Sequence, residues 1–280
     1  MNRDRHSPGN HKPLSVAERL WDEVVHRSKP HHAQLAAPCR RRLRRKQGLE
    51  IGGPSPDLKA DGVLPLYPFV GGVDVCNFDT RTIWEGDIRD GEAFTAEEGG
   101  ATGRQWIREA TALDGIADGS YDFVVSWHSL EHTANALAAL HEWKRVVLEG
   151  GYLLIAVPDP TGTFDHRRPI TPFDHFVADY ERGIGEDDLT HLPEILELHD
   201  LSRDPLAGTP EQFKERSLKN AESRCLHHHV FSLGVLIHLL DHLGLQVVGT
   251  EQSPPVHIIA LVQKPRAGDT VDNARFLATR

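Results

Sequence analysis

The chain has 280 residues, of which 39% are hydrophobic and 26% are charged. This length is enough for one large hydrophobic core, and this composition is typical of a globular protein. No apolar run approaches the ~20 residues that cross a bilayer, and the net charge of −10 disfavours general binding to nucleic acid, whose phosphates attract basic surfaces. We therefore expect neither a membrane protein nor a nucleic-acid-binding protein.

The N-terminus and the cysteines both point to a cytoplasmic protein. Residues 1–13 are polar and lack the apolar core of a signal peptide, so we expect them to form a disordered tail. Cys39, Cys76 and Cys225 are scattered and form no CxxC pair, which is typical of reduced thiols and not of a disulfide framework or a zinc ribbon.

Predicted helices and strands alternate along most of the chain. In order they are helix 16–26, helix 38–47, strand 48–52, strand 70–75, strand 121–126, helix 137–148, strand 152–157, helix 232–243, strand 245–250 and strand 257–263. The last two strands flank Pro254-Pro255, and we expect them to pair as an antiparallel hairpin. This alternation predicts an α/β fold with a doubly wound, mostly parallel sheet.

Three stretches depart from this alternation. Residues 159–226 contain few apolar runs and many charged residues, which indicates a large insertion after the fifth strand, over the carboxyl edge of the sheet. Residues 265–280 have the pattern of a tail, so the predicted domain is 14–264. The basic cluster Arg40–Lys46 is either a solvated helix end or a docking patch for an acidic partner or a phosphate.

The strand ends carry a candidate ligand site, because open α/β sheets bind ligands beyond the carboxyl ends of their strands. The first strand runs into Glu50–Ser55, whose glycines permit close approach of a ligand. Asp74 ends the next predicted strand, roughly 20 residues later, at the spacing of a ribose-binding acid, and Asp79 is its rival. Pro54 and Pro56 interrupt the helix start that a pyrophosphate needs, which favours an adenosyl ligand without phosphates over NAD.

The segment Asp118–His132, DGSYDFVVSWHSLEH, resembles the fourth-strand signature of class I methyltransferases, D-x-S-x-D-h-V-h-S-x-x-x-L-E-H, where h is apolar. As in that family, a helix containing Lys144–Val147 and then Glu149–Gly151 precede the next strand. The resemblance covers residues 48–158. It implies a Rossmann-like, seven-stranded sheet with a C-terminal antiparallel hairpin, S-adenosyl-L-methionine as the cofactor, and methyl transfer as the activity.

The same resemblance implies which residues contact the cofactor. The family's first motif, usually acid-x-Gly-x-Gly-x-Gly, is shortened here, and its acid orients the amino-acid end of the cofactor. The third motif, which gives an Asp beside the adenine amino group, falls near Asp114. The implied cofactor-binding residues are Glu50, Gly52, Gly53, Pro54, Ser55, Asp74, Leu113, Asp114, Ser126 and Trp127.

Part of the insertion, Thr163–Arg168 with Thr171, His175 and Asp179-Tyr180, resembles a bacterial subgroup of these enzymes linked to modification of glycans or small molecules. The resemblance implies O-methylation of a small molecule or glycan, with the insertion as lid and acceptor pocket, and the sequence leaves a homodimer open. The alternatives are a non-catalytic scaffold with the methyltransferase fold in a biosynthetic complex and, third, a nucleotide-dependent oxidoreductase.

Candidate catalytic residues follow the predicted strands. Methyl transfer to a hydroxyl requires a base, and the imidazole of His128 can serve as one near pH 7. Asp159 and His166 are further candidates, and a structural role is the alternative for each. The predicted substrate-binding residues are Arg167, Arg168, His175 and His229, the arginines because guanidinium groups bind carboxylates or phosphates in a bidentate manner.

Histidine is abundant, with 18 residues, which raises the question of a bound metal. Neighbouring side chains diverge, so the run His227–His229 cannot direct all three rings at one ion. Asp159, Asp165 and His229 would suit Mg²⁺ or Zn²⁺. The pattern nevertheless favours a structural histidine cluster, and we predict no metal.

Overall fold

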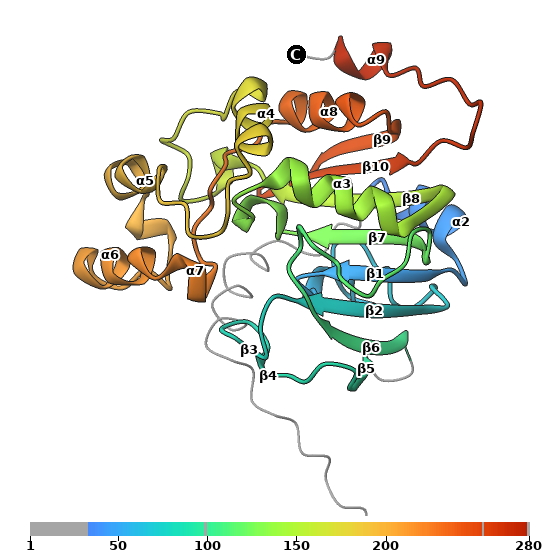
Figure 1. The fold of residues 1–280 in the computed structure, drawn as a ribbon, viewed down its shortest axis with the longest axis horizontal. Coiled ribbons are helices and arrows are strands. Elements are labelled where there is room, and N and C mark those ends of the chain that lie inside the picture. Colours follow the sequence, from blue (N-terminus) through green and yellow to red (C-terminus); the bar gives the residue numbers. More distant parts are fainter. Residues whose placement is uncertain (1–32, 98–99, 254, 279–280) are drawn as a thin grey trace, which may run out of the picture.

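A mixed sheet of eight strands forms the centre of the computed structural model, which describes residues 33–97, 100–253 and 255–278. The predicted tail 1–13 and helix 16–26 lie outside the described residues. The strands lie in the order β5-β6-β2-β1-β7-β8-β10-β9 (Figure 1). Their bounds are β1 Gln47–Ile51, β2 Gly72–Asn77, β5 Ala93–Thr95, β6 Thr102–Ile107, β7 Tyr121–Trp127, β8 Val147–Pro158, β9 Gln246–Ser253 and β10 His257–Gln263.

The strand order reverses at β1. Strands β1, β2, β6, β7 and β8 are parallel, β10 is antiparallel to both β8 and β9, and β5 is antiparallel to β6. From β1 the chain proceeds to β2 and β6 on one side, and it then returns to β7 and β8 on the other side. Such a reversal opens a crevice at the carboxyl ends of the strands, where α/β sheets bind ligands.

The remaining elements are shorter. The helices are α2 Ala36–Leu43, α3 Ala136–Val146, α4 Phe173–Arg182, α5 Leu192–Leu198, α6 Pro210–Leu218, α7 Asn220–Ser223, α8 Leu233–His242 and α9 Ala274–Leu277. The 3-10 turns are η1 Pro56–Leu58, η2 Leu130–His132, η3 Pro160–Gly162 and η4 Leu201–Arg203, and a two-stranded sheet joins β3 Arg81–Thr82 to β4 Gly86–Asp87. No helix in the described ranges is long and apolar enough to cross a membrane.

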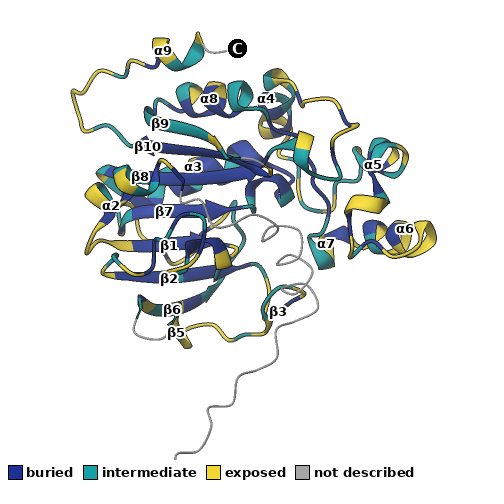
Figure 2. Cartoon of the chain, turned by 180° about the vertical axis from the view of Figure 1, so that it is seen from behind, coloured by how far each residue is buried: buried dark blue, intermediate teal, exposed yellow. Residues whose placement is uncertain are grey.

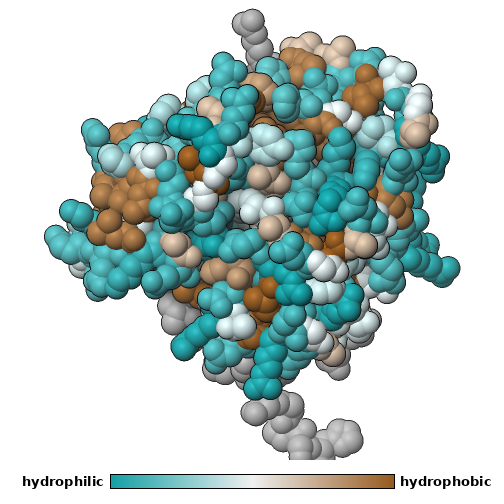
Figure 3. Space-filling model, viewed as in Figure 1, coloured by the Kyte–Doolittle hydropathy of each residue, from teal (hydrophilic) through white to brown (hydrophobic). Residues whose placement is uncertain are grey.

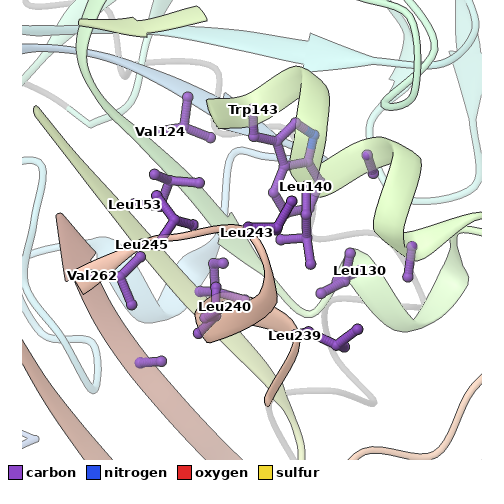
Figure 4. Packing of buried hydrophobic residues seen from close by; sticks show 14 of the residues in the cluster. Val124, Leu130, Leu140, Trp143, Leu153, Leu239, Leu240, Leu243, Leu245 and Val262 are labelled. Carbon is purple, nitrogen blue, oxygen red and sulfur yellow. The ribbon is translucent and has the colours of Figure 1, made fainter. Parts of the chain in front are cut away.

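Apolar residues cover both faces of the central sheet. On one face, side chains of α3 and α8 pack against the strands, and Figure 4 shows Leu140 of α3 beside Leu243 at the end of α8. On the other face, α2 and residues 58–67 pack against strands β2, β7, β8 and β10. The strongly apolar strand β7 is buried between these two layers, as a central parallel strand requires.

The structure confirms the Rossmann-like α/β fold and the C-terminal hairpin of β9 and β10, but its sheet has eight strands instead of seven. Sequence analysis missed β5 and β6 at one edge. Both strands are partly exposed, and the sequence of β6, TGRQWI, lacks a clear alternation of apolar and polar residues. An edge strand of this composition carries little periodic signal.

The segment after β10 is not a free tail throughout. Asn273 is 3% exposed, and its side-chain amide donates hydrogen bonds to the Asp241 carboxylate and to the Leu245 carbonyl oxygen. Its side-chain oxygen accepts from the Val247 amide, and α9 follows directly. A buried polar side chain therefore fastens this segment to the domain, which a search for apolar periodicity does not detect.

The insertion between β8 and α8 lies at the end of the sheet to which the parallel strands point (Figure 1). Its helices α5 and α6 are exposed on their outer sides and buried on their inner sides (Figure 2). They share a small core with Leu192, Ile195 and Phe213 at its centre. The view in Figure 3 shows a mainly hydrophilic surface with scattered apolar patches, in keeping with the net charge of −10.

We expect Leu240→Ala to lower the free energy of unfolding by about 2–5 kcal/mol, because it opens a cavity in the packed layer between α8 and the sheet. The matched control is Leu218→Ala, since Leu240 is fully buried whereas Leu218 is 52% exposed. Chemical denaturation of both variants measures the difference. Equal losses of stability would contradict the placement of α8 against the sheet.

Candidate active site

A cavity of about 280 Å³ lies at the carboxyl ends of β1, β2, β6 and β7. The strand ends form one wall, and the insertion and the segment that follows it form the other. The residues of the first wall include Gly52, Asn77, Ala110 and Trp127. The residues of the second wall include Phe164, Asp204, Arg224 and His227. The sheet and the insertion therefore enclose one shared space.

A buried carboxylate shapes the loop after β1. Glu50 is 0% exposed, and its Oε1 accepts hydrogen bonds from the amide and the hydroxyl of Ser55, at 2.9 and 2.6 Å. Its Oε2 accepts from the Tyr67 hydroxyl at 2.6 Å. Burial raises the pKa of Glu50, and these hydrogen bonds partly offset that effect. Glu50 does not line the cavity, and these hydrogen bonds position the loop that does.

Gly52 and Gly53 connect this loop to the neighbouring strand ends. Gly52 has a φ of +77°, and a Cβ at this position would lie 2.2 Å from Ser129 Oγ, so only glycine fits. The Gly53 carbonyl oxygen accepts a hydrogen bond of 2.9 Å from the Asn77 side chain, which ties the loop to the end of β2. The predicted loop residues that line the cavity are Gly52, Pro54 and Ser55.

The prediction that a strand ends at Asp74 is wrong, because β2 continues to Asn77 through its pairing with β6. The Asp74 carboxylate faces neighbours within the sheet layer. It accepts hydrogen bonds from the Tyr121 hydroxyl at 2.7 Å, from the Trp106 indole at 3.2 Å and from the Arg104 amide at 2.9 Å. It does not line the cavity, so the structure gives it no contact with a ribose there.

The rival acid, Asp79, does not line the cavity either. Asp79 is exposed, and its carboxylate accepts hydrogen bonds from the amide and hydroxyl of Thr80. Glu85, which precedes β4, does line the cavity and is half-buried. The carboxylate that lines the cavity beside β2 therefore comes from the β3–β4 turn, which sequence analysis did not consider.

The two residues predicted to lie beside the adenine do not line the cavity. Leu113 is fully buried in the core and Asp114 is exposed, and neither lines the cavity. The residues just beyond β6, Glu109 and Ala110, do line it. Arg224 binds both oxygens of Glu109, at 2.7 and 3.2 Å. The misplacement follows from the missed strand β6, since the end of an unrecognised strand cannot be located from the sequence.

Three successive residues at the end of β7 have different environments. Ser126, a predicted cofactor contact, is fully buried and does not line the cavity. Trp127 lines the cavity as predicted, and its indole donates a hydrogen bond of 2.8 Å to Asp57. His128 also lines the cavity and has a φ of +53°, an uncommon conformation outside glycine.

Both imidazole nitrogens of His128 face protein groups. Nε2 lies 2.8 Å from His257 Nδ1, and Nδ1 lies 3.6 Å from a carboxylate oxygen of Glu131. Burial, and next the neighbouring His128, lower the pKa of His257 to about 2, so that His257 is neutral at physiological pH. As a base, His128 would have to give up one of these contacts to accept a proton.

A second histidine in the cavity wall is held by an aspartate. His227 is buried, and its Nδ1 forms a very short hydrogen bond with the Asp165 carboxylate. Burial alone would lower the pKa of His227, but the charge and the hydrogen bond of Asp165 outweigh burial and raise it. Burial would likewise raise the pKa of Asp165, yet His227 and Arg168 lower it to about 2. Sequence analysis noted the histidine run but did not assign His227 a role.

Two more groups approach His227. His132 lies edge-on to it, with 4.6 Å between the ring centroids, and His132 Nδ1 is 3.0 Å from the Leu226 carbonyl oxygen. Burial lowers the pKa of His132 to about 4, so this ring is neutral at physiological pH. Glu131 is 1% exposed, and neither of its carboxylate oxygens has a hydrogen-bond partner in the described residues.

Three other predicted site residues serve the structure of the insertion. Asp159 caps η3 by accepting hydrogen bonds from the amide and hydroxyl of Thr161. His166 and Arg167 both bind Asp200, at 2.8 and 3.1 Å. Because none of the three lines the cavity, the structure does not support their predicted catalytic or substrate-binding roles.

Arg168 has a role that the sequence did not suggest. Its side chain is 1% exposed and forms ion pairs with Asp165 and Glu194 at 2.9 Å each. It also donates hydrogen bonds to the carbonyl oxygens of His227 and His228, at 2.8 and 3.2 Å. Arg168, a predicted substrate-binding residue, therefore holds the segment that contains His227.

Two groups of side chains have the composition and spacing to hold a metal ion. One is Glu131, His132 and His227 in the cavity wall, and the other is His175, Asp179, His191 and His229 outside the cavity lining. Within each group the ligand atoms lie within 4.8 Å of one another. The predicted combination of Asp159, Asp165 and His229 is not brought together, since Asp165 binds Arg168 and His227 whereas His229 contacts Asp179.

Comparison with known proteins assigns the chain to a family. Residues 42–250 match the family model described as "Methyltransferase domain". This match covers more than half of the chain and includes the strand ends that form the cavity, so the chain belongs to the methyltransferase-domain family. S-adenosyl-L-methionine is the cofactor of this protein. No curated protein matches the sequence.

Solved structures with similar folds come from several organisms. A SAM-dependent methyltransferase from Thermotoga maritima is 17% identical, with 88% of this chain and 93% of that chain covered and a TM-score of 0.46. One from Methanosarcina mazei is 16% identical, with 81% and 96% covered and a TM-score of 0.44. One from Aquifex aeolicus is 10% identical, with 88% and 97% covered and a TM-score of 0.43.

The residues at the cavity suit this cofactor. Gly52 lines the cavity without a side chain, and Phe78 and Ala110 line it with apolar surface. Glu85 and Glu109 add carboxylates to the lining, and negative charge there would favour a positively charged sulfonium nearby. Polar groups on apolar walls are the usual composition of a cofactor site.

Asp204 connects two parts of the insertion at the cavity wall. It is 8% exposed, and its Oδ2 lies 3.1 Å from both His199 Nε2 and Arg216 Nη2. Burial would raise the pKa of Asp204, but its hydrogen bond with His199 and the positive charge of Arg216 outweigh burial and lower it.

We expect Asp204→Asn to destabilise the protein at pH 7 by about 1–3 kcal/mol, the usual effect of losing one partner of a buried hydrogen-bonded pair. The pKa of Asp204 is lower in the folded than in the unfolded state, where it is about 3.9, so its ionisation stabilises the fold above pH ~4. This stabilisation is lost as the pH falls through the folded-state pKa. Denaturation of both proteins from pH 7 to pH 3 should show a shrinking difference, and a constant difference would contradict an ionised Asp204.

Proposed function

We propose that the protein methylates a hydroxyl oxygen of a small molecule or glycan, with the cofactor on the sheet side of the cavity and the acceptor on the insertion side. The observation that carries this proposal is the position of His227, held by Asp165, in the cavity wall that the insertion forms. The cofactor supplies an activated methyl group. The residues of the chain have to bind the acceptor, orient it and remove its proton.

The cofactor side of the proposal uses the residues at the strand ends. Gly52 and Ser55 would lie along the amino-acid end of the cofactor, on the loop that Glu50 holds in place. Glu85 would accept hydrogen bonds from the ribose hydroxyls, because Asp74 and Asp79 do not line the cavity. Ala110 would contact the adenine ring, beside Glu109.

The base in this proposal is His227, not His128. Asp165 occupies Nδ1 of His227 and fixes the tautomer, which leaves Nε2 for a proton from the acceptor. A histidine held in this way by a carboxylate is the arrangement that general bases commonly use. His128 would position Glu131 and the turn η2, because its own nitrogens already face His257 and Glu131.

The insertion would form the acceptor pocket and exclude water. Phe164, Asp204 and Leu206 contribute to the cavity wall, and all three belong to the segment that follows β8. Arg203 and Arg216 also line this side, so the acceptor would meet both apolar and cationic groups. A glycan or a phenol with an anionic group fits such a lining better than a purely apolar acceptor does.

We expect Glu85→Gln to weaken binding of S-adenosylhomocysteine roughly ten- to a hundredfold, the effect of losing charged hydrogen bonds worth about 1.5–3 kcal/mol. The matched control is Asp79→Asn, because Asp79 is exposed and does not line the cavity. Isothermal titration calorimetry measures both affinities. An Asp79 variant that loses more affinity than the Glu85 variant would reassign the ribose contact.

We expect His227→Gln to reduce methyl transfer by about 10²–10⁴-fold, the usual contribution of a general base, with little change in the affinity for S-adenosylhomocysteine. Asp165→Asn should reduce the rate as well, because the ring then loses its fixed tautomer. Transfer of labelled methyl groups to a panel of hydroxylated sugars and phenols gives the rates. If His128→Ala lowers the rate and His227→Gln does not, His128 is the base.

A further inference from the structure

Four side chains that no step of the proposed reaction uses converge outside the cavity lining. His175 and Asp179 lie one turn apart on α4, His191 precedes α5, and His229 lies between α7 and α8. Asp179 and His229 are buried, with side chains 6% and 0% exposed, and the side chain of His175 is 32% exposed. The cluster thus has a buried interior and an open side.

The distances within the cluster are those of ligands around one ion. Asp179 Oδ2 lies 3.1 Å from His175 Nε2 and 3.1 Å from His229 Nε2. The Nε2 atoms of His175 and His191 are also 3.1 Å apart. A tetrahedral zinc ion with bonds of about 2.0–2.1 Å separates its ligand atoms by about 3.3 Å. The four groups therefore need to move only slightly to surround an ion.

Hydrogen bonds alone satisfy these contacts poorly. Each neutral imidazole has one N–H, and a carboxylate oxygen only accepts. If His175 and His229 both donate to Asp179 through Nε2, the Nε2–H of His175 has to be shared with His191 as well. A cation at the centre would accept the lone pairs of all four groups at once.

The carboxylate of the cluster also has a partner outside it. The other oxygen of Asp179 accepts a hydrogen bond of 2.8 Å from Arg182. Ligand carboxylates in metal sites commonly have such an outer partner, which fixes their orientation.

We propose that His175, Asp179, His191 and His229 bind a divalent transition-metal ion, with Zn²⁺ as the ion best suited to three imidazoles and one carboxylate in tetrahedral geometry. The site uses all four positions for protein ligands, which is typical of a structural and not a catalytic zinc ion. It does not depend on the proposed methyl transfer.

An ion at this position would join three separate parts of the insertion. Helix α4, the turn before α5 and the segment after α7 contribute ligands from positions far apart in the sequence. His229 is two residues from His227, whose backbone Arg168 holds at the cavity wall. A bound metal ion would therefore stabilise the wall of the cavity without contacting a ligand inside the cavity.

The test is Zn²⁺ binding by the full chain after treatment with a chelator and gel filtration. Competition with a chromogenic chelator gives the number of bound equivalents and their affinity. We expect His175→Ala and His191→Ala each to weaken the binding of one equivalent roughly a hundredfold or more, and Zn²⁺ to raise the melting temperature of the wild type. Co²⁺ in place of Zn²⁺ should give the visible absorption of a tetrahedral complex.

The matched control is His141→Ala, which removes a histidine that stacks on Tyr180 of α4 but lies outside the cluster. It should retain the wild-type affinity for Zn²⁺. Because His175 and His191 are only partly buried, their alanine variants should fold, which circular dichroism verifies. The proposal is overturned if the wild type binds no Zn²⁺, or if both cluster variants bind the same number of equivalents as the wild type with the same affinity.

Discussion

The site depends on the buried carboxylate of Glu50. With no exposed surface, this group has to find hydrogen-bond donors inside the protein, and it finds them in Ser55 and Tyr67. These bonds close the loop after β1 into a compact turn. Gly52 then passes close to Ser129, where a side chain would not fit. The floor of the cavity is the result of this one constraint.

On the opposite wall, the buried guanidinium of Arg168 likewise fixes the backbone that lines the cavity. The guanidinium of Arg168 is almost fully buried and is paired with Asp165 and Glu194, and its remaining donors bind the carbonyl oxygens of His227 and His228. Removing one partner of such a pair is costly, because it leaves a buried charge uncompensated. Arg168 therefore fixes the backbone of His227, while Asp165 fixes its ring. Both walls of the cavity are built around a charge that the cavity itself does not contact.

The strong apolar strands could be predicted from the sequence, whereas the site chemistry could be predicted only in part. Strand β7 and the hairpin β9–β10 follow from buried β-branched residues, and the glycine loop follows from its position after β1. Strands β5 and β6 carry weak periodicity, so the end of β6 and the role of Glu109 were missed. The strand end that we predicted at Asp74 lies three residues later, at Asn77, because pairing with β6 extends β2.

The insertion shows why roles in a site are hard to assign from residue types alone. His166, Arg167 and Arg168 have the residue types of a substrate site, but each satisfies a carboxylate of the insertion itself. Sequence alone does not show whether an arginine meets an acid of its own chain or one of a ligand. The partners Asp200 and Glu194 come from distant positions, and only the fold brings them close, whereas Asp165 lies three residues before Arg168.

The central claim is that the cavity between the glycine loop and the insertion holds the cofactor. Hydrogen–deuterium exchange of the full chain, with and without S-adenosylhomocysteine, tests this most directly because it locates the site. We expect slower exchange in residues 51–55, 76–78, 83–85 and 108–110, the segments that supply cavity-lining residues at and beyond the ends of β1, β2 and β6. Unchanged exchange in all of these segments at saturating ligand, or protection confined to residues elsewhere, would contradict the claim.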